Sequence, residues 1–408
     1  MKIKSTLICI SMFLGTFLFA ETLTLKQCID IAQTNNPTIQ QRQLSSEIGK
    51  SKVKQSFSAI MPSVSVSSGL GSSSQNSWDL SQSMGISAGL TFYRPGLYSG
   101  IKSAKITGEA NRAASISTQN DITTQVSTLY FRILSTKTLI QVYEGNIAVA
   151  EENLKKTRSM YKLKVITESD VLKSEVQKGD FESQLLIQKQ LYISYLRSMN
   201  ILLGRDANTG FDVADVDVDN IDIPQYDIAW DMMLKRNPDY ESAQLQEQIS
   251  KVVLNASKEA YLPSLSGQYS YTNTFDPLLT PTNSVNLSAS WTLFNGLSRR
   301  ENVQQKKLEL EQTRITLDNT LRLLEQQLRD YYTQFETYTA MIDINKRRLK
   351  SAQRDFSIVN QQYRLGKVTI LDRMQAQISV LSAESSLVEA QYSRKMVESE
   401  IHKLINKK

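Results

Sequence analysis

The chain carries the same series of short motifs twice, at an offset of about 201 residues. The recurring pairs are Asn36-Pro37 and Asn237-Pro238, Met61-Pro62-Ser63 and Leu262-Pro263-Ser264, Leu90-Thr91-Phe92-Tyr93 and Trp291-Thr292-Leu293-Phe294, Gly96-Leu97 and Gly296-Leu297, and Tyr161-Lys162-Leu163 and Tyr363-Arg364-Leu365. A constant offset in one order indicates two copies of a structural unit. The sequence therefore predicts one repeat over residues 21–204 and another over 231–408, joined by an acidic linker at 205–230.

The first twenty residues have the pattern of a secretory signal peptide. Lys2 and Lys4 form a positive start, an apolar stretch runs from Leu7 through Phe19, and Ala20 is a plausible cleavage point. No later stretch supplies the roughly 18 consecutive apolar residues of a membrane-spanning helix. We therefore expect an exported protein with residues 1–20 removed and no transmembrane helix.

Charge and motifs exclude several classes of function. The formal charge of +6 is small for 408 residues, so it gives no basis for nucleic-acid binding. The sequence contains no P-loop, no nucleophile elbow and no dinucleotide fingerprint, and His402 is its only histidine. After removal of the leader, Cys28 is the only cysteine, and we expect it to be a buried structural residue. We predict no enzyme activity, no cofactor and no metal site.

The linker between the two repeats is strongly acidic. Residues 206–231 carry eight Asp and no Lys or Arg. Asp215, Asp217 and Asp219 alternate as in a calcium-binding loop, but Asn220 stands at the sixth position, which such a loop gives to Gly. A solvated connection between the repeats is therefore the favoured interpretation.

Four segments alternate between apolar and small polar residues, at about 62–72, 83–93, 263–273 and 285–294. Their apolar series are Val64, Val66 and Leu70; Met84, Ile86, Ala88, Leu90 and Phe92; Leu265, Tyr269 and Tyr271; and Val285, Leu287, Ala289, Trp291 and Leu293. Period two places each series on one face of a strand. Each run has the roughly 9–11 residues that a tilted strand needs to cross a bilayer, and aromatic residues near the ends fit an interfacial girdle. The alternative is a pair of soluble hairpins with one wet face.

Four strands are too few to close a spanning barrel, because an open edge in lipid leaves backbone groups unpaired. If the segments span a membrane, the chain must associate with copies of itself. Two chains would supply eight strands and three would supply twelve, and strand count alone allows both.

Long helices are predicted between the strands and the end of each repeat. Residues from about 97 to 160 and from about 297 to 362 contain no Pro, and a helix of about 60 residues is roughly 90 Å long. Coiled-coil spacing is present in the second copy, where Val303, Leu310, Leu317, Leu324, Tyr331 and Tyr338 recur every seven residues beside a seam of Phe335, Ile342, Leu349, Phe356 and Tyr363.

Return helices at about 168–203 and 369–404 predict hairpins, with Gly366 as a C-terminal cap. In each repeat, one shorter helix is expected to run from near Leu25 or Ala229 to the proline before the strands. The helical pattern alone is equally compatible with a solvated coiled coil that forms no channel.

The ordered motifs resemble those of TolC-type outer-membrane factors over essentially the whole mature chain. The resemblance rests on Leu23-Thr24-Leu25 with Ala32 and Asn36-Pro37, the duplicated Pro-Ser strand starts, Trp291-Thr292-Leu293-Phe294-Asn295-Gly296, and Tyr363-Arg364-Leu365-Gly366 leading into Asp372. It implies a mainly α fold with a membrane β-barrel, in which long antiparallel coiled-coil hairpins form an α-barrel and four strands per protomer contribute to a shared 12-stranded trimeric β-barrel. It also implies a homotrimer in the outer-membrane lipid with a large periplasmic part.

In function, the resemblance implies a passive exit duct for efflux or type I secretion. Such a duct works with a periplasmic adaptor (membrane fusion) protein and an inner-membrane pump, and it has no cofactor. Drugs, metal ions and secreted proteins all remain open as its cargo. The alternative function is a periplasmic coiled-coil adaptor or scaffold without a barrel, which would have no use for duplicated lipid-facing strands.

The resemblance further implies a gate at the periplasmic tip, near the two helix-hairpin turns. Matching positions place Asp170 and Tyr363 in the closing contacts, whereas the family's Arg position is Val368 here, so that the neighbouring Lys367, or Arg364, would substitute for it. Asp372 matches one acidic residue of the entrance, and the second acidic position is Gln375 here. Three copies of Asp372 around an axis would favour cations. The alternative role for Asp170 and Asp372 is stabilisation of a helix N-terminus.

Overall fold

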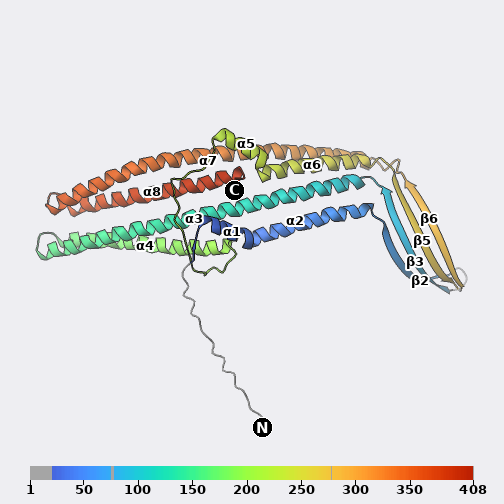
Figure 1. Cartoon of the computed structure of the whole chain (residues 1–408), viewed down its shortest axis with the longest axis horizontal. Coiled ribbons are helices and arrows are strands. Elements are labelled where there is room, and N and C mark those ends of the chain that lie inside the picture. Colours follow the sequence, from blue (N-terminus) through green and yellow to red (C-terminus); the bar gives the residue numbers. More distant parts are fainter. Residues whose placement is uncertain (1–20, 75–77, 277, 408) are drawn as a thin grey trace, which may run out of the picture. The chain divides into compact units, whose positions relative to one another are not determined.

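The computed structural model describes residues 21–74, 78–276 and 278–407, and it contains the same series of elements twice (Figure 1). The first series is α1 (Leu25–Asn35), α2 (Pro37–Ser56), the 3-10 helix η1 (Phe57–Ile60), β2 (Ser63–Ser74), β3 (Trp78–Tyr93), α3 (Leu97–Lys162) and α4 (Glu168–Leu202). The second series is α5 (Tyr226–Arg236), α6 (Pro238–Glu259), β5 (Ser264–Asp276), β6 (Leu278–Ser290), α7 (Ser298–Arg364) and α8 (Ile370–Leu404). The duplicated, mainly helical fold is therefore confirmed, whereas the predicted signal peptide lies outside the described residues.

By packing, the chain divides into two compact units that do not coincide with the sequence repeats. One unit comprises the residues up to 36 together with 125–221 and 338–396, and the other comprises 37–124, 222–337 and the residues from 397 onward. Each unit takes residues from both repeats, because α3, α7 and α8 are continuous helices that run through the boundaries.

The prediction of one short helix before the strands is wrong, because each repeat has two. Asn36 separates α1 from α2 with ψ 124°, and Asn237 separates α5 from α6 with ψ 120°. Both are extended because a residue that precedes proline is sterically excluded from the helical region. The Asn-Pro motif is therefore a helix break.

The long helices form the predicted hairpins, α3 with α4 and α7 with α8 (Figure 1). All residues of the two seven-residue seams in α7 are buried or half-buried, with Leu310, Leu324 and Ile342 the most enclosed. Local cores are small, as expected for thin helical layers, and one consists of Ala150, Phe181 and Leu381. None of the helices in the described chain is both long and apolar enough to cross a membrane.

The strands form one antiparallel sheet in the order β2-β3-β5-β6 (Figure 1). The hydrogen-bonded ladders continue to Ser74↔Trp78 and to Asp276↔Leu278, so β3 and β6 begin earlier than their alternating side chains indicate. β6 ends at Ser290 instead of 294, and the indole nitrogen of Trp291 donates to the backbone oxygen of Tyr261 at 2.9 Å. Side-chain alternation marks the faces of a strand, whereas backbone pairing sets its ends.

The acidic linker is partly ordered, in contrast to the expected solvated connection. Its strand β4 (Phe211–Val213) pairs in parallel with β1 (Glu21–Leu23), and Phe211 and Val213 are buried. The hydroxyl of Tyr130 lies 3.1 Å from the oxygen of Leu23 and 2.6 Å from that of Ala214. Burial raises the pKa of Tyr130 to about 12, so this hydroxyl stays protonated as a donor. Apolar residues spaced among the aspartates provide the burial.

Candidate functional site

One face of the sheet consists of small polar residues in register across all four strands. Ser65, Ser87, Ser270 and Ser284 occupy one row of neighbours. The hydroxyl pairs Ser65–Ser87 and Ser270–Ser284 are 2.8 and 2.7 Å apart. The next rows are Ser63, Gly89, Gln268 and Asn286, and Ser67, Gly85, Thr272 and Thr282. This face can contact water along its whole width.

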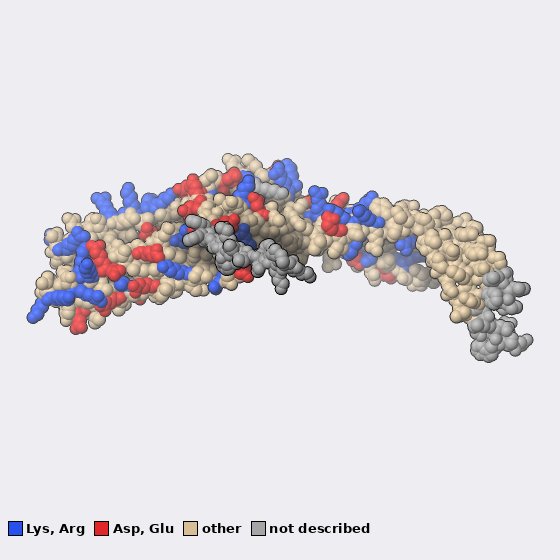
Figure 2. Space-filling view, turned by 60° about the horizontal axis from the view of Figure 1, so that its bottom comes forward, with Lys and Arg blue, Asp and Glu red and all other residues tan. Residues whose placement is uncertain are grey.

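The opposite face is mainly apolar, with Asn283 at the end of one row, and it is uncovered. Val66, Ile86 and Tyr271 are neighbours in one row, and Tyr269 and Val285 are neighbours in the next. Val66 is 64% exposed and Val285 84% exposed. No Lys, Arg, Asp or Glu occurs among the described side chains of the four strands, residues 63–71, 82–93, 264–274 and 281–290, and the sheet is free of charge colours at the right of Figure 2. A contiguous, exposed and mainly apolar surface without charged side chains marks a site of contact with a membrane, a ligand or a protein partner.

The sheet also has two open edges, β2 and β6. Each edge presents backbone N–H and C=O groups that have no strand partner among the described residues. In lipid, such groups must be paired because no water is available to them.

The hairpin turns at the ends of α3 and α7 have the same construction. The amide of Val165 donates to the oxygen of Met160 at 3.0 Å, and that of Lys367 donates to the oxygen of Gln362 at 3.0 Å. These are the 6→1 bonds of Schellman caps, and they require a left-handed residue one position earlier. Gly366 fills that position in the second turn with φ 69°, which confirms its predicted role, whereas Lys164 adopts φ 60° in the first.

Asp170 and Asp372 occupy equivalent positions, each in the first turn of a return helix. The amide and hydroxyl of Thr167 donate to Asp170 Oδ2 at 3.2 and 2.8 Å, and those of Thr369 donate to Asp372 Oδ2 at 2.8 and 2.6 Å. Hydrogen bonds from Thr369 lower the pKa of Asp372. Both carboxylates thus form capping boxes within the chain, and Lys173 Nζ lies 3.8 Å from Asp170.

Tyr363 lies apart from these carboxylates and contacts other residues. Its hydroxyl donates to Met160 Sδ at 4.0 Å, a contact that joins the two hairpins, and its ring lies 5.7 Å from the guanidinium carbon of Arg373. Lys367 is exposed, and no hydrogen bond or ion pair of its side chain occurs within the described chain, while Val368 is half-buried. The structure brings Tyr363 together with neither Asp170 nor Lys367 inside one protomer.

Arg373 is the residue at the tip that the sequence prediction missed. It is buried at 4% exposure, its Nε donates to Asn360 Oδ1 at 2.7 Å, and its guanidinium carbon lies 5.6 Å from the ring centre of Phe356. Burial lowers the pKa of Arg373. Arg373 is at helical spacing from the buried Ile370 and Gln377, which could have predicted that it shares their buried face. An arginine in such a pattern is usually solvated, so the sequence alone does not favour burial.

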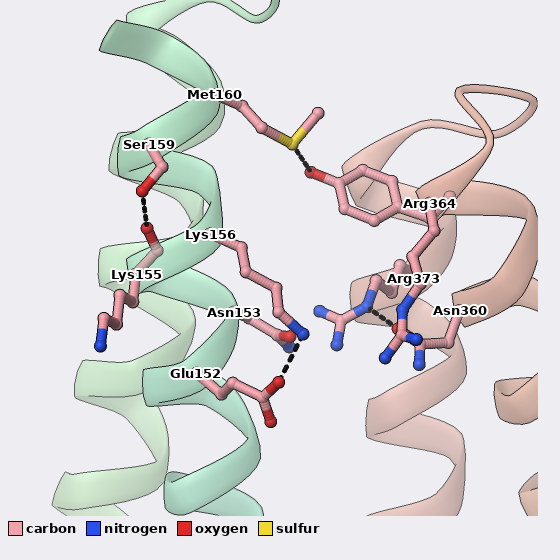
Figure 3. Close-up of a pocket in the computed structure, with 10 residues that line it drawn as sticks. Glu152, Asn153, Lys155, Lys156, Ser159, Met160, Asn360, Arg364 and Arg373 are labelled. Atoms are coloured by element: carbon pink, nitrogen blue, oxygen red, sulfur yellow. Dashed lines mark hydrogen bonds and ion pairs between the residues drawn. The ribbon is translucent and has the colours of Figure 1, made fainter. Parts of the chain in front are cut away.

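A cavity of about 540 Å³ lies beside Arg373, between the ends of α3 and α7 (Figure 3). Its lining consists of Glu152, Asn153, Lys155, Lys156, Ser159, Met160, Asn360, Tyr363, Arg364 and Arg373. In Figure 3, Lys156 and Glu152 on α3 face Arg364 and Arg373 on the other hairpin. Lys156 pairs with Glu152 one helical turn away.

The fold is shared with solved outer-membrane channels. CusC superposes with a TM-score of 0.87 at 15% identity, covering 95% of this chain and 93% of CusC. The Campylobacter jejuni CmeC outer membrane channel gives 0.85 at 17% identity, with 93% and 85% covered. The open state of the Neisseria gonorrhoeae MtrE outer membrane channel gives 0.80 at 16% identity, with 93% and 88% covered. Comparison with curated proteins gives no match.

The duplicated helical hairpins and the two-faced sheet therefore have the fold of these outer-membrane channels. The profile of the outer membrane efflux protein family matches residues 28–195 and 229–407, one segment in each repeat. The chain belongs to the outer membrane efflux protein family. The protein is an efflux channel component of the outer membrane, with a large helical part in the periplasm.

Proposed function

We propose that the protein is the homotrimeric exit duct of a tripartite efflux or type I secretion system, gated at its periplasmic helical tip. The two-faced sheet with open edges carries this proposal. Because β2 and β6 run in opposite directions, β6 of one copy can pair antiparallel with β2 of the next, which leaves no open edge once the ring closes. Three copies would supply twelve strands, the number favoured by the family resemblance.

The two faces of the sheet supply the two environments of such a barrel. The apolar face would contact outer-membrane lipid, and the serine-rich face would line an aqueous lumen. Small side chains on the inner face leave the passage wide. This arrangement supports the duct over the adaptor or scaffold, since an adaptor has no lipid to cover the apolar face.

The helical hairpins would form the tunnel wall in the periplasm. Apolar side chains remain uncovered on α4 and α7, with Val176 at 64%, Leu186 at 68%, Leu308 at 60% and Ile315 at 63% exposure. Neighbouring protomers would cover these side chains. In this proposal residues 1–20 direct export, 21–204 and 231–408 are the duplicated wall segments, and 205–230 joins them.

The gate would use Asp170, Tyr363, Lys367 and Asp372 at the hairpin turns. Lys367 has its side chain free for a contact with a neighbouring protomer, in place of the family's arginine at 368. A periplasmic adaptor protein and an inner-membrane pump would supply the cargo and the energy. Opening then separates Tyr363 from Met160, so Tyr363→Phe should raise the single-channel conductance in planar bilayers. Unchanged conductance would exclude a closing role for this hydroxyl.

Two neighbouring substitutions in β3 test the duct itself. Ile86→Lys places a charge on the apolar face, whereas Ser87→Lys places it on the polar face, at adjacent positions. A lysine facing lipid near the midplane costs about 2–4 kcal/mol, so Ile86→Lys should reduce recovery from the outer-membrane fraction. Ser87→Lys should assemble and shift selectivity toward anions. Native mass spectrometry of the extracted wild type should give a trimer, and equal tolerance of both lysines would refute the barrel.

A further inference from the structure

The cavity at the tip has more positive charge than its own residues neutralise. Lys155, Lys156, Arg364 and Arg373 line it, against the single carboxylate of Glu152. That carboxylate is already paired with Lys156 on the same helix. The proposed duct makes no use of this charge, and the proposed gate uses Lys367, which lies outside the cavity, and not Arg364.

Arg373 is the most unbalanced of these groups. It is buried, and no carboxylate lies within ion-pair distance of it in the described chain. It belongs to the first turn of α8, where the helix dipole disfavours a cation. Burial is the main cause that lowers the pKa of Arg373 and Arg364 adds to it, whereas Tyr363 and Glu152 act to raise it. The C-terminal end of α7, which favours a cation, carries Arg364 and also the Asn360 and Tyr363 contacts of Arg373.

The rest of the lining has a polar part, formed by Asn153, Ser159 and Asn360, and an apolar part. The thioether of Met160 and the ring of Tyr363 lie beside the guanidinium groups, and the aliphatic stems of the lysines add to this surface. A volume of about 540 Å³ is within the range of small-molecule sites. Cationic groups that adjoin an apolar wall match a ligand with an acidic group and an apolar body.

We propose that this cavity binds an amphipathic organic anion, with its acidic group between Arg364 and Arg373 and its apolar body against Met160 and Tyr363. Guanidinium groups suit this task because their planar N–H donors match a carboxylate. Such a ligand contacts α3 and the α7–α8 hairpin at once. Its binding therefore stabilises the packing of the two hairpins, whether or not the protein transports it.

The test uses the full-length purified protein in lipid nanodiscs, with 2-naphthoate as the probe and isothermal titration calorimetry as the readout. Arg364→Gln removes one cation of the cavity. Lys367→Gln removes the same charge from the adjoining turn, where the side chain does not line the cavity, and serves as the matched control. We expect saturable binding, weakened about tenfold or more by Arg364→Gln and less than twofold by Lys367→Gln.

Two further arms check the location and the chemical class. In the wild-type protein, naphthoate binding should slow amide hydrogen exchange near residues 152–160 and 360–373. This measurement needs no variant, so it remains valid if a variant folds poorly. The cation 2-naphthylmethylammonium should not compete, and inorganic phosphate should compete at least tenfold more weakly. Absence of saturable binding, equal weakening by both variants, or competition by the cation would overturn the proposal. Equal affinity for phosphate and naphthoate would overturn its apolar part.

Discussion

The side chain of Asn237 links the end of α8 to the start of α6. Its Nδ2 donates to the backbone oxygen of Leu404 at 3.0 Å, while its Oδ1 accepts from the amides of Asp239 and Tyr240 at 3.0 Å each. Asn36 makes the corresponding bond to the oxygen of Leu202 at 2.8 Å. The duplicated Asn-Pro motif therefore breaks a helix and fastens the end of another one.

Replacement of Asn237 should destabilise the protein measurably. Asn237→Ala removes a helix N-cap and leaves the carbonyl of Leu404 without its donor, with an expected loss of about 2–3 kcal/mol in the free energy of unfolding. Asn237→Ser keeps a cap acceptor and loses the donor without placing a carboxylate against the Leu404 carbonyl, so its loss should be smaller. Denaturant unfolding in detergent measures both, with the exposed Asn208→Ala as control. Wild-type stability in both variants would contradict this role.

Because Lys137 contacts Asp212, the free energy of unfolding should decrease as the pH falls into the acid range. Burial acts to raise the pKa of Asp212, but hydrogen bonds from Lys137 at 2.8 Å, the Val213 amide and Tyr192 outweigh it, so the pKa is lowered. A carboxyl with a lowered folded-state pKa contributes stability above its ordinary pKa near 4 and loses it as the pH falls through the folded value. Because the pair is partly exposed, we expect about 1 kcal/mol.

Asp212→Asn tests this dependence by comparison of unfolding curves at several pH values. The variant should be less stable than the wild type at pH 7, and the gap should narrow as the pH falls below about 4. A gap of constant size down to strongly acid pH would show that charge at Asp212 does not contribute.

The two roles of Asp170, as helix cap and as gate, are separable by conductance. Thr167→Val removes the hydroxyl of the capping box and keeps the carboxylate, whereas Asp170→Ala removes the carboxylate. If the charge closes the tip, Asp170→Ala should raise single-channel conductance well above the level of Thr167→Val. Equal conductance in the two variants would leave Asp170 as a cap only.

Substitutions at the left-handed positions of the two hairpin turns, Lys164 and Gly366, should change the stability of the turns in opposite directions. Lys164 and Gly366 both have positive φ, and a left-handed residue with a Cβ costs about 1–2 kcal/mol. Lys164→Gly should slow hydrogen exchange of the Val165 amide severalfold, and Gly366→Ala should speed exchange of the Lys367 amide. The reverse order of effects would contradict the Schellman geometry of these turns.

Cys28 should resist alkylation in the folded protein. Burial raises the pKa of its thiol to about 11, so the reactive thiolate is scarce at pH 8. Mass spectrometry after iodoacetamide treatment should show little labelling until guanidinium chloride unfolds the chain. Gln43→Cys, at an exposed position of α2, is the accessible control. Complete native labelling of Cys28 would show that the α1 region opens readily.

Local pattern was enough to predict the strands and long helices. The seams through Leu310 and Leu324 and the alternation around Ile86 depend only on how one segment exposes its own faces. The helix break at Asn36 could also have been predicted, because a proline restricts the backbone of the residue before it. We instead predicted one continuous helix across this position.

The amino-acid pattern alone predicts the long helices, the duplication and the two faces of the strands, because periodicity and chain order are properties of single segments. The folded structure is needed to show that β3 pairs with β5 across the repeats, that Arg373 is buried against Tyr363, and that Asp170 and Asp372 cap helices. Those choices depend on packing between segments far apart in the chain. A pattern within one segment does not specify its partner, nor does it show that a charged side chain is enclosed.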